Sequence, residues 1–312
     1  MNIIVTGGTG FIGQALCALL CQGGHQLAVL TRRPEAVHRL FGLAVTAVLW
    51  NGREGGAWEE SLDGADAVIN LAGAPIADAR WTHTRKRLLT SSRVLPTRLL
   101  VEAMSRRPAK PRTLISASGI GYYGASDDRV LDETATPGRG FLADLCRAWE
   151  AEALRAGQSG ARVVLVRSGM VLEQEGGALP KMTAPFRLFA GGPVMPGTQW
   201  ISWIHRRDHV GLIEWALTTP TVVGPLNAVA PEAVTMTQFC KVLGRVLRRP
   251  SWLPVPGLAL RIALGELGTV LTTGQRVTPG KAIGGGYSFR YPTLEPALRA
   301  IFGGMEEASR TA

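Results

Sequence analysis

The feature that most constrains the fold is a glycine-rich stretch near the amino terminus. Residues 2–5 form a short apolar run that predicts a buried strand, and the sequence TGGTGFIG follows at residues 6–13. Leucines at helical spacing come next, two glycines at residues 23–24 end that helix, and residues 26–31 predict a second strand. Strand, glycine turn, helix and strand make one βαβ unit, which predicts a parallel sheet.

Each glycine of the turn has a predicted purpose. Gly7 can take the tight turn that leaves the strand, Gly10 lets a pyrophosphate approach the backbone, and Gly13 lets the helix pack closely. The free N–H groups at the start of the helix then face the phosphates. The spacing is Gly-x-x-Gly-x-x-Gly. In this context it predicts a dinucleotide site, with a plain glycine turn as the alternative.

The end of the second strand indicates which dinucleotide binds. Folds that bind NAD usually carry Asp or Glu there, which holds the ribose 2′-hydroxyl. This chain has Thr31, Arg32, Arg33 and Pro34 instead, so no carboxylate repels a 2′-phosphate and two guanidinium groups can bind it. The sequence therefore predicts NADP(H) as the cofactor. The alternative for one of these arginines is a solvated loop charge.

The composition excludes several other classes of protein. Of the 312 residues, 46% are hydrophobic and 19% are charged, which is typical of a folded soluble chain. The formal net charge of +10 comes largely from arginines spread along the chain. There is no basic block with interleaved aromatics, as a nucleic-acid platform would have. The surplus favours anionic ligands in general, and we expect no nucleic-acid partner.

The cysteines and the apolar runs bear on location. Cys17, Cys21, Cys146 and Cys240 lack metal-ligand spacing, so we expect no metal site and reduced thiols. No apolar run reaches transmembrane length, and the first predicted strand begins where a signal peptide would stand. We therefore expect a cytoplasmic protein without a membrane partner.

Predicted strands and helices alternate along the first half of the chain, which is typical of an α/β fold with a doubly wound parallel sheet. Further strands are expected at residues 44–49, 67–71, 112–118, 162–166 and 225–229. Helices are expected at residues 57–62, 82–104, 140–158, 208–217, 235–247 and 258–267. We predict a Rossmann-type domain over residues 1–172, to which residues 207–229 return. A smaller carboxy-terminal α/β domain on the substrate side would cover residues 173–312.

Six motifs together resemble the extended short-chain dehydrogenase/reductase superfamily, which includes nucleotide-sugar epimerases. They are TGGTGFIG at residues 6–13, NLAG at 70–73, the stretch from Arg80 to Arg93, WEAEA at 149–153, VRSGMVL at 166–172 and SWIHRRD at 202–208. They are similar to one atypical, epimerase-like branch that has its own carboxy-terminal domain. The resemblance covers Asn2 to about Ile301, and it does not imply a substrate.

The resemblance implies cofactor contacts at matching positions. The pyrophosphate would be lined by Gly7, Thr9, Gly10, Phe11, Ile12 and Gly13. The adenosine side would be met by Thr31, Arg32, Arg33, Asn70, Leu71, Ala72, Gly73 and Ser116. Arg93 would reach the cofactor from the long helix, with a salt bridge on the helix surface as the alternative.

The sequence departs from the superfamily at its catalytic pair. Members that transfer hydride use a Ser and then Tyr-x-x-x-Lys on one helix face, because the Tyr hydroxyl, with an ordinary pKa of about 10, needs a nearby ammonium to favour the phenolate. No Tyr-x-x-x-Lys occurs in this sequence. With Glu150 matched to the family's usual helix acid, Leu142 takes the Tyr position and Cys146 takes the Lys position. Neither side chain can do the work of the residue it replaces.

Three interpretations remain open. In the first, Ser118 survives as a hydrogen-bond donor and Tyr122 or Tyr123 becomes the acid/base. In the second, the cofactor binds without the usual redox cycle. In the third, His205 or Asp208 supplies the chemistry, although a lone His is more often packed or at the surface.

We therefore expect an NADP(H)-binding, epimerase-like oxidoreductase that acts on a sugar-nucleotide-like or small carbonyl substrate. The alternative is an NADP(H)-binding sensor or interaction protein. In extended reductases, helices such as those at residues 82–104 and 140–158 often pair between subunits, which leaves a homodimer open.

Overall fold

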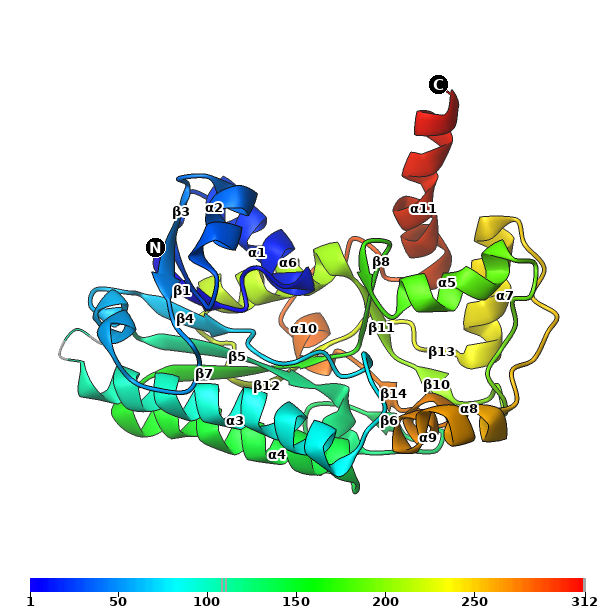
Figure 1. The fold of residues 1–312 in the computed structure, drawn as a ribbon, viewed down its shortest axis with the longest axis horizontal. Coiled ribbons are helices and arrows are strands. Elements are labelled where there is room, and N and C mark those ends of the chain that lie inside the picture. Colours follow the sequence, from blue (N-terminus) through cyan, green and yellow to red (C-terminus); the bar gives the residue numbers. More distant parts are fainter. Residues whose placement is uncertain (108, 110, 311–312) are drawn as a thin grey trace.

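A seven-stranded parallel sheet forms the centre of the molecule (Figure 1). The computed structural model describes residues 1–107, 109 and 111–310, and their side chains except at residues 259, 261, 263, 264 and 304–310. The sheet order is β12-β7-β5-β4-β1-β2-β3, with bounds Gly224–Ala228, Arg162–Ser168, Thr113–Gly119, Ala67–Asn70, Asn2–Thr6, Gln26–Thr31 and Val45–Leu49. Every neighbouring pair is parallel. The predicted Rossmann-type fold is confirmed.

Helices cover both faces of this sheet (Figure 1). α1 (Phe11–Gln22), α2 (Pro34–Phe41) and α6 (Arg206–Thr218) lie on one face, and α3 (His83–Arg106) and α4 (Phe141–Leu154) lie on the other. This double cover explains why the central strands are buried almost throughout. The order also reverses at β1, between β4 and β2, which is where such sheets bind ligands.

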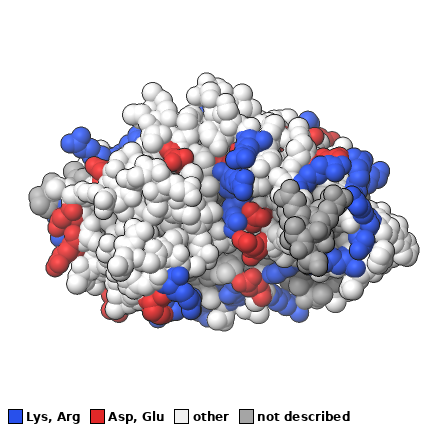
Figure 2. All heavy atoms as spheres, turned by 90° about the horizontal axis from the view of Figure 1, so that it is seen from above, with Lys and Arg blue, Asp and Glu red and all other residues white. Residues whose placement is uncertain are grey.

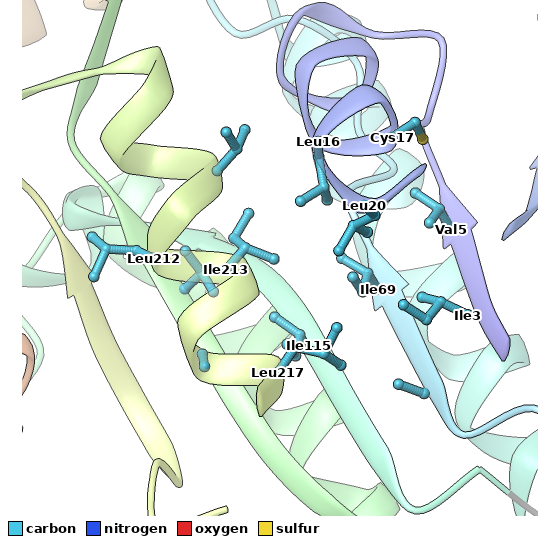
Figure 3. Close-up of a cluster of buried hydrophobic side chains, with 14 of the residues drawn as sticks. Ile3, Val5, Leu16, Cys17, Leu20, Ile69, Ile115, Leu212, Ile213 and Leu217 are labelled. Atoms are coloured by element: carbon cyan, nitrogen blue, oxygen red, sulfur yellow. The ribbon is translucent and has the colours of Figure 1, made fainter. Parts of the chain in front are cut away.

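Alternation along the strands divides the apolar residues between two cores. Ile3 and Val5 of β1 pack against α1 and α6, together with Leu16, Leu20 and the α6 residues Leu212 and Ile213 (Figure 3). Ile4, between them, belongs to the core under α3. Successive side chains of a strand point to opposite faces, so a single strand serves both cores.

The rest of the chain forms a second lobe with its own core. That core joins Trp203, Phe186 and Phe239 to residues of the carboxy-terminal helix. Its helices are α5 (Leu179–Arg187), α7 (Met236–Leu247), α8 (Gly257–Leu264), α9 (Glu266–Thr272) and α11 (Leu294–Arg310). The short helix α10 (Gly280–Gly284) instead contacts β12, and its Ala282 belongs to the core that contains Leu212 and Ile213 of α6. Its short strands are β8 (Met170–Glu173), β9 (Gly176–Gly177), β10 (Trp200–Ile201), β11 (Trp203–His205), β13 (Val234–Thr235) and β14 (Arg276–Val277), and β14 pairs with β6 (Val130–Leu131). α6 and β12 return to the central sheet.

Most elements end within one or two residues of the sequence expectations, and three helices differ in extent or type. The helix expected at residues 258–267 is two helices, α8 and α9, with Gly265 between them at a φ of 62°. The helix expected at residues 140–158 ends at Leu154 and continues as the 3-10 helix η3 (Arg155–Ser159), which Gly160 ends in the left-handed conformation. The helix expected at 57–62 is the 3-10 helix η1 (Ala57–Leu62). Among the described residues, no helix is both long and apolar enough to cross a membrane.

Candidate active site

A cavity of about 630 Å³ opens at the carboxyl ends of β1, β2, β3 and β4. This edge of the sheet is where a doubly wound fold binds its ligand, and the volume lies in the range of small-molecule sites. Its walls come from the glycine turn, the ends of β2 and β3, the segment after β4 and one face of α3. The lining residues are Thr6, Gly7, Thr9, Gly10, Leu30, Thr31, Arg32, Trp50, Asn51, Gly52, Arg53, Leu71, Ala72, Gly73, Ala74, Pro75, Leu88, Ser91, Ser92, Leu95 and Pro96.

The glycine turn has the predicted geometry. Gly7 has a φ of 69°, and a Cβ there would stand 2.7 Å from the Leu71 carbonyl oxygen. A Cβ on Gly13 would stand 2.2 Å from the Gly7 carbonyl oxygen, so α1 packs directly on the turn. At Gly10, apart from its chain neighbours and its own helix backbone, the Gly7 oxygen is the one atom of the described residues within 4 Å of such a Cβ. The turn therefore leaves one open backbone face, at the position where Gly10 lines the cavity.

Two guanidinium groups line the end of the cavity formed by β2 and β3. Arg32 follows β2 and Arg53 follows β3, and Trp50 and Asn51 line the wall as well. Arg33 does not line the cavity, and its backbone N–H donates to Thr31 Oγ1 at 3.1 Å. No Asp or Glu occurs among the described lining residues. With two positive side chains and no negative one among the described lining residues, this end of the cavity suits a phosphate.

Below the cavity, Asn70 joins neighbouring strands and α3. Asn70 Oδ1 accepts from Thr6 Oγ1 at 2.7 Å, and Nδ2 donates to Thr97 Oγ1 at 2.8 Å and to Ser116 Oγ at 3.4 Å. Asn70 and Ser116 are both fully buried. They hold the end of β4 in place beneath the segment from Leu71 to Pro75 that forms the cavity wall.

Arg93 is a buried cation behind that wall. Its guanidinium carbon would lie 3.0 Å from a Cβ on Gly73, and its side chain donates to the carbonyl oxygens of Leu89 and Ala74. Its Nε has no hydrogen-bond partner among the described residues. Burial lowers the pKa of Arg93 to about 10. The side chain of Arg93 therefore stands beside the cavity, and the surface salt bridge considered as its alternative does not form with any described residue.

A polar network occupies the ends of β5 and β7, which run past the end of β4. Ser118 Oγ donates to Glu150 Oε1 at 2.6 Å. Arg167 binds both oxygens of the same carboxylate, from Nε at 2.9 Å and from Nη2 at 2.8 Å. Burial alone would lower the pKa of Arg167, but the hydrogen bonds and charge of Glu150 raise it. Glu150 is thus held as a bidentate ion pair with a hydroxyl attached to it.

Both predicted tyrosines lie against Arg167. The Tyr123 hydroxyl accepts from Arg167 Nη1 at 3.0 Å and donates to Asn227 Oδ1 at 2.7 Å. Tyr123 is 3% exposed, and burial raises its pKa. The Tyr122 ring lies 3.5 Å under the Arg167 guanidinium. A substrate could reach the Tyr123 hydroxyl only by displacing one of its two partners, and the acid/base role of either tyrosine stays a prediction.

One face of α4 turns toward the end of β5. It carries Leu142 and Cys146, which stand at the positions of the superfamily's Tyr and Lys. A Cβ on Gly121 would meet Leu142 Cβ at 2.9 Å, and Cys146 Sγ lies 3.6 Å from the Gly119 carbonyl oxygen. Burial and the charge of Glu150 raise the pKa of Cys146 to about 11, so the thiol is neutral. Leu142, Cys146 and Glu150 follow one another at a spacing of four, on one helix face.

The residues of the third interpretation have structural partners. His205 caps α6, with Nδ1 accepting from the Arg207 N–H at 3.0 Å, and its ring stacks on Tyr291. Asp208 accepts from the backbone N–H groups of Arg290 and Tyr291, both at 2.8 Å. These contacts join α6 to the segment before α11. A catalytic role for either residue stays a prediction.

The structure brings together about half of the predicted cofactor residues. Those that line the cavity are Gly7, Thr9, Gly10, Thr31, Arg32, Leu71, Ala72 and Gly73. Phe11 instead packs under Gly176 and Gly177, and Ile12 belongs to the core. The sequence reasoning missed Trp50, Asn51 and Arg53. The sequence did indicate their position, because they follow the third strand, which ends at the same edge of the sheet as the second.

The residues present fit a dinucleotide that carries a 2′-phosphate. The open backbone at Gly10 suits a pyrophosphate. Two arginines, without a carboxylate among the described lining residues, suit the additional phosphate at the other end. No group of three or more His, Cys, Asp or Glu among the described residues could hold a metal ion. The fold and the cavity thus define a Rossmann-type dinucleotide-binding protein.

Comparison with known proteins then gives the family. The model of the NAD dependent epimerase/dehydratase family matches residues 3–228, and a domain of unknown function, DUF1731, matches residues 255–301. The chain therefore belongs to the NAD dependent epimerase/dehydratase family. The resemblance to an epimerase-like branch with its own carboxy-terminal domain is confirmed.

Relatives match the chain over almost its whole length. It is 42% identical to the chloroplastic epimerase family protein SDR39U1 homologue of Arabidopsis thaliana, over 96% of this chain and 86% of that one. It is 41% identical to the epimerase family protein YfhF of Bacillus subtilis, over 96% and 98%. A crystal structure of the human epimerase family protein SDR39U1 with NADPH superposes with a TM-score of 0.87, at 35% identity over 96% of this chain and 99% of that one.

Proposed function

We propose that the protein binds NADP(H) and works as an epimerase-like oxidoreductase on a substrate with a hydroxyl or carbonyl group, of the sugar-nucleotide or small-carbonyl kind. The observation that carries the proposal is the pairing of a cavity lined by Arg32 and Arg53 with a hydroxyl–carboxylate pair, Ser118 and Glu150, at the adjacent strand end. The NADPH in the human relative supports the choice of cofactor. The bacterial relatives and four free cysteines support a cytoplasmic location.

The chain's own residues would position the cofactor along the sheet edge. Arg32 and Arg53 would bind the 2′-phosphate, and the open backbone at Gly10 would receive the pyrophosphate. The nicotinamide, when bound, would give or take a hydride at the substrate carbon. Arg93 would lie behind the cavity wall at Gly73, close to a ribose of the bound cofactor.

Ser118 and Glu150 would handle the proton. When a substrate alcohol is oxidised, its hydroxyl proton would pass to Ser118 Oγ while the Ser118 proton passes to Glu150 Oε1, 2.6 Å away. In reduction the same two protons would move in the opposite direction. The bidentate ion pair with Arg167 would hold the carboxylate in place beside Ser118. This arrangement would do the work that Leu142 and Cys146 cannot.

The test is transfer of deuterium from C4-labelled NADPH to a metabolite extract, followed by mass spectrometry. The native protein should label one product class. Glu150→Gln keeps the shape of the side chain but cannot take the proton, so transfer should fall by about 10²–10⁴-fold. Glu152→Gln, which removes a carboxylate from the other side of the same helix, should leave transfer unchanged. Equal transfer by both variants would refute the role of Glu150.

A sensor or interaction protein is the second candidate. It is favoured by the hydrocarbon of Leu142 and the neutral thiol of Cys146 at the two positions where relatives that transfer hydride carry Tyr and Lys. This function predicts tight NADPH binding without label transfer to any component of the extract. The same labelling experiment therefore separates the two candidates.

A further inference from the structure

The lobe that carries α5, α7 and α8 ends in two neighbouring loops. Residues 188–195 follow α5 and residues 249–256 follow α7, and they lie together at the end of the molecule away from the central sheet (Figure 1). Bridges between Gly191 and Ser251 and between Val194 and Val255 join the loops. The two loops therefore form one surface.

That surface exposes large apolar side chains in a group. The exposed fractions are 78% for Leu188, 55% for Phe189, 44% for Met195, 65% for Trp252 and 40% for Leu253. We call these five residues the apolar tip. Single exposed apolar residues are ordinary, but a contiguous group marks an interaction site. The Trp252 indole N–H donates to the Phe189 carbonyl oxygen at 3.0 Å. Because this donor is already paired, the ring can enter an apolar environment without losing a hydrogen bond.

The surroundings of the apolar tip are strongly basic. Residues 176–200 and 236–258 contain no Asp or Glu, and they contain Lys181, Arg187, Lys241, Arg245, Arg248 and Arg249. Lys181 pairs with Asp78 and Arg245 pairs with Glu295. The Arg249 guanidinium lies 4.6 Å from the centre of the Phe189 ring, which brings positive charge to the tip itself. Figure 2 shows Lys and Arg gathered on this lobe beside its uncharged end.

We propose that the apolar tip is a peripheral docking surface for a membrane that contains anionic lipids. Leu, Phe and Trp side chains enter the boundary between headgroups and acyl chains, while neighbouring cations bind the lipid headgroups. A second copy of the chain fits this surface less well, because pairing two tips would bring two sets of arginines together. The expectation of no membrane partner rested on the lack of a spanning segment, which attachment at a surface does not need.

The test is sedimentation of the full-length protein with vesicles of phosphatidylcholine, with and without phosphatidylserine. We expect binding to the phosphatidylserine vesicles only, and its loss in concentrated salt. Leu188→Ser and Trp252→Ser should each weaken this binding roughly tenfold. Leu43→Ser removes a side chain that is 97% exposed on the other lobe and should change nothing. Unaltered NADPH binding by the tip variants would show that they remain folded.

Three results would overturn the proposal. The first is the absence of binding to both kinds of vesicle. The second is equal binding by the Leu188→Ser, Trp252→Ser and native proteins. The third is a concentration-dependent dimer in light scattering that Trp252→Ser abolishes, since the tip would then be an interface between copies of this chain.

Discussion

At the scale of single residues, two arginines that are distant in sequence, Arg32 and Arg53, line one cavity. Arg32→Ala and Arg53→Ala should each weaken NADPH binding by about 10–100-fold, because each removes a charge-assisted contact of about 1.5–3 kcal/mol. NADH affinity should change little, since NADH lacks the 2′-phosphate. Isothermal calorimetry measures both. Arg33→Ala is the matched control, and a similar loss for both dinucleotides would contradict the role of the arginines.

A buried hydroxyl gives a second prediction. Tyr123→Phe leaves Asn227 Oδ1 and one Arg167 N–H without that partner, so the free energy of unfolding should fall by about 1–3 kcal/mol. Urea denaturation measures the change. Tyr122→Phe keeps the ring under Arg167 and should have little effect. A Tyr123→Phe protein that is fully stable but transfers no label would instead identify Tyr123 as the acid/base.

The residues of the cavity wall could be placed from the sequence more readily than the polar network around Glu150, for a physical reason. The glycine turn and Arg32 lie within one local βαβ unit, so their spacing alone specifies their places. Ser118, Glu150 and Arg167 come from β5, α4 and β7, and their meeting depends on how far those strands run past β4. Sequence spacing carries no signal for that, and Glu150 was used only to align the helix.

At the scale of elements, the contact between α1 and the glycine turn is the critical packing. Gly13→Ala would place a Cβ 2.2 Å from the Gly7 carbonyl oxygen, against backbone that cannot move away cheaply. We expect a loss of about 1–3 kcal/mol in the free energy of unfolding, together with loss of NADPH binding. Denaturation and calorimetry measure the two effects.

Gly157→Ala serves as the control for that substitution. A Cβ on Gly157 would meet no atom of the described part of the chain within 4 Å, apart from its chain neighbours and its own helix backbone. The stability and the NADPH affinity of the Gly157→Ala protein should match those of the native protein. If Gly13→Ala also bound NADPH normally, the close packing of α1 on the turn would not be needed for the site.

Elements were predicted where their patterns are local and missed where they are not. The strand at residues 26–31 has the predicted bounds, because it is a short apolar run between turn residues. The pattern did not predict α2, which buries only Ala36 and Val37. β8 and β9 were also missed, since they form a small sheet with β11 that no local period encodes.

At the scale of the whole molecule, buried histidines make stability depend on pH. Burial lowers the pKa of His209 to about 4 from 6.5. The unfolded chain therefore takes up a proton below about pH 6.5 while the folded chain stays neutral. The contribution of neutral His209 to the free energy of unfolding is therefore complete above about pH 6.5, and it is lost as the pH falls toward 4. By pH 5 the loss should be about 2 kcal/mol from this residue.

Urea denaturation at pH 7.5, 6 and 5 measures this loss. His209→Gln should flatten the pH dependence, because the amide does not titrate. His38→Gln, at an exposed position on α2, should leave the dependence as it is. An unchanged slope in His209→Gln would mean that other groups control the acid sensitivity.

The measurement that tests the account most directly is a comparison of NADPH and NADH binding by the native protein in isothermal calorimetry. The cavity with two arginines predicts one NADPH per chain, bound at least about tenfold more tightly than NADH. Equal affinity for the two dinucleotides, or no binding of either, would contradict it.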